Sequence, residues 1–129
     1  MPLVTISLRP GRTSAQKSAI MQAVHESLVE AFKIPAGDFN QRLLELSLEN
    51  FHIPDNHSEL YTVVEMTVFP GRSLAAKRKL YADIVVKFAA LGIPREDVFI
   101  VLHEPPLDNW SVQGGGPASE TKVGFKLDV

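Results

Sequence analysis

None of the 129 residues is a cysteine, which excludes disulfide bonds, thiol catalysis and thiolate metal sites. The 13 lysines and arginines do not outnumber the 15 acidic residues, and a net charge of −2 argues against a nucleic-acid-binding surface. The chain has no apolar run of the roughly 20 residues that cross a bilayer. It also lacks the basic and then apolar start of a signal peptide. With 45% hydrophobic and 22% charged residues, we expect one globular, cytoplasmic domain.

The chain contains two similar halves. Residues 10–17 read PGRTSAQK and residues 70–77 read PGRSLAAK. The agreement continues in residues 34–39 and 93–98, which both begin Ile-Pro and carry an aspartate at the fifth place. Such self-similarity through turn, helix and exit loop indicates a duplicated supersecondary unit. Within one domain spanning 1–129, we expect unit one at about 2–48, a linker at 49–60, unit two at about 61–104 and a C-terminal tail at 105–129.

Each unit reads as strand, helix, strand. Leu3 to Leu8 alternates apolar and polar residues, as a strand with one buried face does. Thr13 and Gln16 form the T-x-x-Q capping box of a helix, which must end before Pro35. The other predicted strands are 41–48, 62–68 and 98–102, with a short edge strand at 121–125. The apolar stripes of the two helices are predicted from helical spacing at Ile20, Val24, Leu28 and Ala31, and at Leu80, Ile84, Phe88 and Leu91.

These elements predict an α+β fold, in which a duplicated β-α-β unit forms a four-stranded mixed sheet with both helices on one face. The crossovers are long enough for parallel pairing within each unit. Residues 98–102 are the most apolar strand, so we expect them at the centre of the sheet. The other face of the sheet is left uncovered and partly apolar. We therefore expect oligomerisation to bury it.

Pro2 is the first candidate for chemistry. Met-Pro is a common beginning, and taken alone it carries no functional meaning. If Met1 is removed, Pro2 becomes a secondary amine at the start of a buried strand. An ordinary α-amino group titrates at about 7.7–8.0, and burial lowers that value because it disfavours the cation. A neutral amine near working pH is a general base.

Arg72 and its counterpart Arg12 each precede a helix N-cap. Arginine, helix dipole and free backbone N–H groups together favour an anion, although a single exposed arginine is more often simply solvated. Asp38 follows the first helix, with its counterpart Asp97 after the second. It is either a turn residue or a carboxylate that orients water or a proton near Pro2. Trp110 suits either a pocket wall or core and oligomer packing. The four histidines show no metal-ligand spacing.

With Pro2 opening a strand and residues 11–17 reading GRTSAQK, the chain resembles the tautomerase superfamily typified by 4-oxalocrotonate tautomerase. The two-unit length, Asp38, the Gly71-Arg72-Ser73 segment and the 108–111 segment DNWS resemble its malonate semialdehyde decarboxylase branch. The resemblance implies a homotrimer and catalysis without metal or organic cofactor. It further implies Pro2 as acid/base, Arg72 as binder of the substrate carboxylate or carbonyl, Asp38 as holder of a proton or water, and Trp110 as pocket wall.

Two departures weigh against decarboxylation more than against tautomerisation. Some decarboxylases of this branch carry a second arginine where this chain has Pro70, and Trp-Ser-Phe-Gly is replaced by residues 110–113, WSVQ. The first hypothesis is a keto–enol tautomerase of a small 2-oxo acid, with Pro2, Arg72 and Asp38 as catalytic residues and Arg72, Trp110 and Arg12 as substrate-binding residues. The second is a decarboxylase or hydratase of a three-carbon oxo acid or haloacrylate, and the third is a non-catalytic family member.

Overall fold

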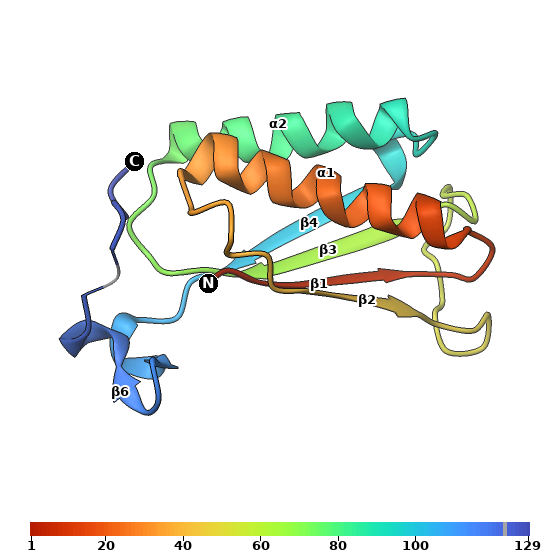
Figure 1. The fold of residues 1–129 in the computed structure, drawn as a ribbon. Helices are drawn as coiled ribbons and strands as arrows, with labels where there is room; N and C mark the ends of the chain where they lie inside the picture. Colours follow the sequence, from red (N-terminus) through yellow and green to blue (C-terminus); the bar gives the residue numbers. More distant parts are fainter. Residues whose placement is uncertain (123) are drawn as a thin grey trace.

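The computed structural model describes residues 1–122 and 124–129. Four strands form a mixed sheet, and two helices cover one of its faces while the other stays open (Figure 1). This arrangement confirms the predicted α+β class. The strands are β1 (Leu3–Leu8), β2 (Gln41–Glu45), β3 (Thr62–Thr67) and β4 (Val98–His103), and the helices are α1 (Ser14–Phe32) and α2 (Leu74–Ala90).

The sheet has the order β2-β1-β3-β4. Within each half the two strands are parallel, since β1 pairs with β2 and β3 with β4 across a helical crossover. The two halves meet where β1 and β3 pair antiparallel, with Leu3 opposite Thr67 and Ser7 opposite Val63. The beginning of β1 therefore lies beside the end of β3, and equivalent parts of the two halves lie at opposite ends of the sheet.

Both helices begin as predicted. Gly11 and Gly71 turn the chain with φ of 129° and 123°, values that favour glycine. Thr13 then caps α1 in a complete capping box with Gln16. Ser73 caps α2 by accepting from the N–H of Ala76. The repeated Pro-Gly-Arg segment is thus the turn that directs each first strand into its helix.

The core lies between the helices and the inner face of the sheet. Seven of the eight stripe residues predicted from helical spacing are buried. Leu91 is the exception: it follows the end of α2 and is 43% exposed. The sheet contributes the buried side chains of Val4, Ile6, Leu8, Val64 and Met66, and Val68 is buried directly after β3.

Two strand predictions differ from the structure, and a third cannot be compared with it. β2 ends at Glu45 rather than Leu48, because its partner β1 ends at Leu8 and the chain then turns through Ser47. The prediction that residues 98–102 are central was wrong, since β4 is an edge strand of this sheet. Its apolar character arises because the alternate residues Val98, Ile100 and Leu102 pack against the core, while Phe99, 52% exposed, lies on the open face. The strand predicted at 121–125 includes residue 123, which lies outside the described residues.

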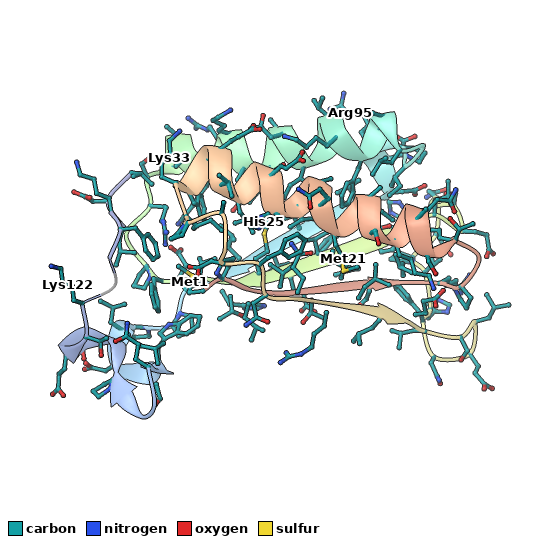
Figure 2. All side chains as sticks on the ribbon, in the orientation of Figure 1. Met1, Met21, His25, Lys33, Arg95 and Lys122 are labelled. Carbon is teal, nitrogen blue, oxygen red and sulfur yellow. The ribbon has the colours of Figure 1, made fainter. Side chains whose placement is uncertain are left out.

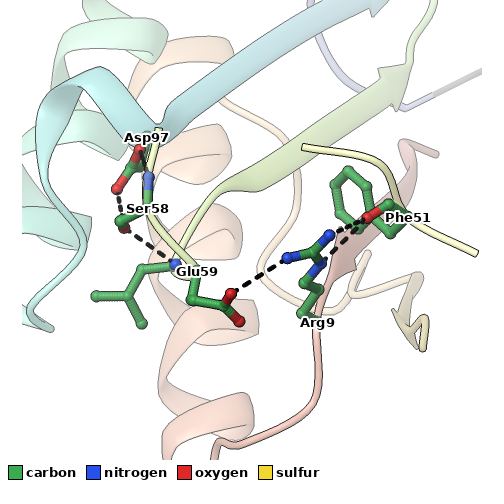
Figure 3. A network of polar contacts seen from close by, with 6 residues as sticks. Arg9, Phe51, Ser58, Glu59 and Asp97 are labelled. Carbon is green, nitrogen blue, oxygen red and sulfur yellow. Dashed lines mark hydrogen bonds and ion pairs between the residues drawn. The ribbon is translucent and has the colours of Figure 1, made fainter. Parts of the chain in front are cut away.

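Residues between β2 and β3 are held to both halves (Figure 3). Arg9 donates from Nε and Nη2 to the carbonyl of Phe51, at 3.1 and 2.7 Å, and pairs with Glu59 at 3.3 Å. Farther along, Ser58 donates to the carboxylate of Asp97 from both its hydroxyl and its backbone N–H. These contacts fix the connection at the end of the sheet remote from Met1.

After β4 the chain forms a small separate layer. It contains a 3-10 turn at Leu107–Asn109, the hairpin of β5 (Ser111–Val112) with β6 (Gly116–Pro117), and a further turn at Ala118–Glu120. Figure 1 shows this blue segment beside the end of the sheet where the chain begins. Among the described residues, neither helix has the length and apolar character that a bilayer crossing requires.

Candidate active site

A cavity of about 240 Å³ lies where the chain begins, at the end of the sheet nearest the C-terminal segment. Figure 2 labels Met1 at this place, next to the tail. The wall combines the chain start, the exit loop of α1, the connection from β3 to α2, and the tail. Its lining residues are Met1, Asp38, Phe69, Val112, Gln113, Thr121 and Phe125.

The chain start is enclosed. Pro2 is buried immediately before β1, as the sequence predicted for a proline opening a strand. The backbone N–H of Phe69 donates to Sδ of Met1 at 3.3 Å, because antiparallel pairing of β1 with β3 brings these segments together. The side chain of Met1 thus occupies space beside the β3–α2 connection.

Asp38 faces the first residue of the chain. Its Oδ2 lies 3.7 Å from the α-amino nitrogen of Met1, and its side chain is 34% exposed. The loop that carries it is held by His25, whose Nε2 bonds the carbonyl of Ala36 at 2.9 Å and whose ring stacks on Phe39 at 4.2 Å. A buried histidine on α1 therefore positions the carboxylate that the sequence identified.

Arg72 is buried, with a relative exposure of 6%. Its Nη1 donates to the carbonyl of Phe69 at 2.9 Å, whereas Nε and Nη2 have no hydrogen-bond partner among the described residues. The guanidinium lies between two rings, with its carbon 5.0 Å from the centroid of Phe32 and 5.8 Å from that of Phe125. Unpaired buried donors are costly, so a group of this kind is suited to binding an anion.

The electrostatic surroundings of Arg72 are mixed. Burial lowers the pKa of its guanidinium from the ordinary value, and the charge of Glu104 acts in the opposite direction. Glu104 is itself paired with Lys77 at 2.7 Å. Arg72 does not line the 240 Å³ cavity directly, but two of its neighbours, Phe69 and Phe125, do.

Trp110 is not among the residues that line the cavity, but it packs against one of them. Its indole N–H donates to the carbonyl of Pro105 at 3.1 Å, and its ring packs edge-on against Phe69 at 4.9 Å. Trp110 therefore supports a wall residue. No motif marks Phe69 or Phe125 in the sequence. Phe69 directly precedes the repeated Pro-Gly-Arg turn, which is the only sequence signal close to it.

Arg12 does not join these residues. It follows the end of β1, whereas Arg72 follows the end of β3, and antiparallel pairing puts those two ends at opposite sides of the sheet. The Nη2 of Arg12 donates to the carbonyl of Leu60 at 3.0 Å. Within one chain, the structure thus brings together Met1-Pro2, Asp38, Arg72 and Trp110, and leaves Arg12 apart.

Comparison with known proteins gives consistent matches. Two family models described as tautomerase enzymes match residues 2–59 and 38–113. A probable tautomerase of Bacillus subtilis strain 168, YusQ, is 27% identical over 121 residues, covering 89% of this chain and 95% of that protein.

Two solved structures share the fold. FG41 malonate semialdehyde decarboxylase inhibited by 3-bromopropiolate superimposes with a TM-score of 0.80 and 31% identity, covering 91% of this chain and 92% of the other. A fused 4-OT described as a symmetric trimer superimposes with a TM-score of 0.80 at 23% identity, covering 91% of this chain and 96% of the other. The matched models, the shared fold and the enclosed chain start lead to one conclusion: this chain belongs to the tautomerase family.

Proposed function

We propose that this protein is a cofactor-independent keto–enol tautomerase of a small 2-oxo acid, with Pro2 as acid/base. The observation that carries the proposal is Arg72, a buried guanidinium that is bonded to Phe69 beside the chain start and has two nitrogens without a partner in the part of the chain that the structure describes. Such a group offers two parallel donors to a carboxylate. Membership of the tautomerase family supports the reaction type.

The reaction requires removal of Met1, after which Pro2 carries a secondary amine. In ketonisation, the neutral amine takes the proton of the enol hydroxyl. The oxygen then forms the carbonyl, and the electron pair of the C=C bond takes a proton from the prolinium to make the new C–H bond. Pro2 ends neutral, so the step transfers one proton from oxygen to carbon and leaves the enzyme unchanged.

Two groups beside Met1 support this assignment. The N–H of Phe69 donates to Met1 Sδ, so loss of Met1 leaves that donor directed into the vacated space, where it can bond a substrate oxygen. The Oδ2 of Asp38 lies 3.7 Å from the α-amino nitrogen of Met1, which supports a role for this carboxylate in holding a proton or water near the amine of Pro2. Trp110 packs against Phe69, which lines the cavity, and so supports the cavity wall.

Intact mass spectrometry, followed by kinetics, tests the proposal. The active protein should lack the mass of Met1, and Pro2→Ala should lower kcat/KM for phenylenolpyruvate ketonisation by about 100-fold or more, the usual contribution of a positioned acid/base. Unchanged ketonisation in Pro2→Ala would refute the mechanism. An active protein that retains Met1 would also refute it, because its proline nitrogen is acylated.

The second candidate is a decarboxylase or hydratase, favoured by the 31% identity to a malonate semialdehyde decarboxylase. In that reaction Pro2 would act as a cation and Asp38 would activate water. The pH profile distinguishes the two: a base mechanism gains activity as Pro2 deprotonates, and a cation mechanism loses it. If the protein releases no carbon dioxide from malonate semialdehyde, the decarboxylase hypothesis is excluded. Inactivity in both assays, together with retained Met1, would favour the third reading, a non-catalytic member.

We also propose a homotrimer. The sheet face opposite the helices carries apolar side chains, among them Phe99 at 52% exposure, and an exposed face of this kind requires cover. The fused 4-OT that shares this fold is described as a trimer. Burial of the open face between copies would satisfy both observations.

A further inference from the structure

Arg12 lines a cavity of about 440 Å³, larger than the one at the chain start. Arg12 is partly buried, and burial lowers the pKa of its guanidinium from the ordinary value. The apolar part of the wall comes from α1, from the linker and from the end of α2. It includes Ala19, Ile20, Leu60, Leu91 and Ile93.

The duplication explains why this cavity is open. Beside Arg72, the side chain that ends α1 is Phe32, fully buried and 5.0 Å from the guanidinium. The residue at the equivalent place beside Arg12 is Leu91, since Phe32-Lys33-Ile34-Pro35 aligns with Leu91-Gly92-Ile93-Pro94. Leu91 is shorter and 43% exposed. The aromatic side chain that fills the space in one half is therefore missing in the other.

The tail adds a second difference. A Cβ at Gly71 would meet the carbonyl oxygen of Leu127 at 3.1 Å, and the ring of Phe125 lies over Arg72. A Cβ at Gly11 would meet no atom of the described residues within 4 Å. The C-terminal segment thus covers the Pro-Gly-Arg turn of the second half only. The turn before Arg12 stays uncovered.

The charges around the cavity favour an anion. None of its lining residues is acidic. Among the described parts of the chain, Arg12 has no carboxylate within ion-pair distance, and its one recorded hydrogen bond is to the carbonyl of Leu60. A guanidinium beside apolar walls matches a ligand with a carboxylate and a hydrophobic body. The volume lies within the range of small-molecule sites.

We propose that the Arg12 cavity is a second binding site, for a small carboxylate with an aryl or branched alkyl body. The site binds without catalysing a proton transfer. The residue equivalent to Pro2 is Thr62, whose nitrogen is a peptide nitrogen within the chain. The residue equivalent to Asp38 is Asp97, which is buried and already bonded to Ser58 and His57. This inference stands independently of the proposed tautomerase activity.

Titration with 3-phenylpropionate, followed by 1H–15N NMR of the full chain, tests the site. We expect shifts at the amides of Ala19, Leu91 and Gly92. Acetate lacks the apolar body and 3-phenylpropanol lacks the charge, so each should bind at least about tenfold more weakly, as expected for loss of one charge-assisted contact or of a buried ring.

Two variants locate the binding. Arg12→Gln removes the charge, and Leu91→Phe supplies the aromatic side chain that fills the equivalent space beside Arg72. Each variant should bind 3-phenylpropionate about tenfold or more weakly than the parent protein does. Retained dispersion of the amide signals would show that the fold is intact. Arg72→Lys should leave the shifts at Leu91 and Gly92 in place. Shifts confined to the surroundings of Phe69 and Phe125, or affinity within twofold of the parent in both variants, would overturn the proposal.

Discussion

The carboxylate of Asp97 accepts hydrogen bonds from both the backbone N–H and the hydroxyl of Ser58, and it lies 3.3 Å from Nδ1 of His57. At 1% exposure it is among the most buried charged groups described. Asp38, at the equivalent place in the first half, is 34% exposed in its side chain and faces the chain start. One copy of the repeated aspartate therefore fastens the linker, and the other borders the candidate site.

The role of Asp97 predicts a loss of stability in Asp97→Asn. The amide cannot accept all the hydrogen bonds that the carboxylate accepts, so we expect a loss of about 1–3 kcal/mol in urea unfolding at pH 7. Asp38→Asn is the matched control and should cost far less, because its side chain is partly exposed. Equal losses in the two variants would contradict the assignment.

The same group predicts a dependence on pH. Burial by itself raises the pKa of Asp97, but hydrogen bonds from Ser58 and His57 outweigh it and hold the pKa below the ordinary value. A lowered folded-state pKa contributes stability above the unfolded value of about 3.9, and that stability is lost as pH falls through the folded value. The difference between the protein and Asp97→Asn should therefore shrink below about pH 4. A constant difference between pH 7 and pH 3 would argue against this role.

Arg72→Gln should lower kcat/KM for a 2-oxo acid by about 100-fold, because it removes the charge that we propose binds the carboxylate. Arg72→Lys keeps the charge but loses the planar fork, so it should recover only part of that loss. Thermal unfolding of both variants controls for the packing of Arg72 between Phe32 and Phe125. Values of kcat/KM within about threefold of the parent would exclude Arg72 from the site.

Gly71→Ala and Gly11→Ala form a matched pair. Both positions have positive φ, so both substitutions should destabilise by roughly 1 kcal/mol. Only at Gly71 would the new Cβ also meet Leu127. We therefore expect faster proteolysis of the C-terminal segment in Gly71→Ala and no such change in Gly11→Ala. Similar proteolysis of the pair would show that the tail does not depend on this close approach.

Phe99→Glu tests the proposed trimer, because it puts a charge on the open face of the sheet. Sedimentation should show a shift from trimer to smaller species. Val86→Glu is the control, since Val86 is 68% exposed on the helical layer, away from that face. A trimer that survives Phe99→Glu would exclude this face as the interface.

Much of the fold could be predicted from the sequence because its local signals agree. The capping box at Thr13 and the repeated Pro-Gly turn predict where both helices begin, and the structure confirms them. The position of β4 could not be predicted. An edge strand with apolar residues on both its buried and its uncovered face has the same sequence pattern as a central strand. Phe99 and Ile100 therefore suggested a central strand.

The candidate site was harder to predict. Arg12 and Arg72 occupy the same place in the repeated segment, so the sequence does not distinguish them. The difference in their surroundings depends on which side chains pack against each one. Phe125 reaches Arg72 from a tail 53 positions later, without a periodic pattern. Phe69 gains its place only through the antiparallel register of β1 and β3. These are tertiary contacts that no local spacing encodes.

The pairing of β1 with β3 also means that the two halves are joined by hydrogen bonds across the sheet itself, in addition to the contacts that the linker makes. A chain severed near Leu60 would therefore persist as a two-chain assembly. The new amine created by the cut would lie at the end of the sheet opposite Met1, beside Arg12. Splitting the gene at this junction would therefore add a second free amine beside Arg12 and leave the amine at the chain start in place.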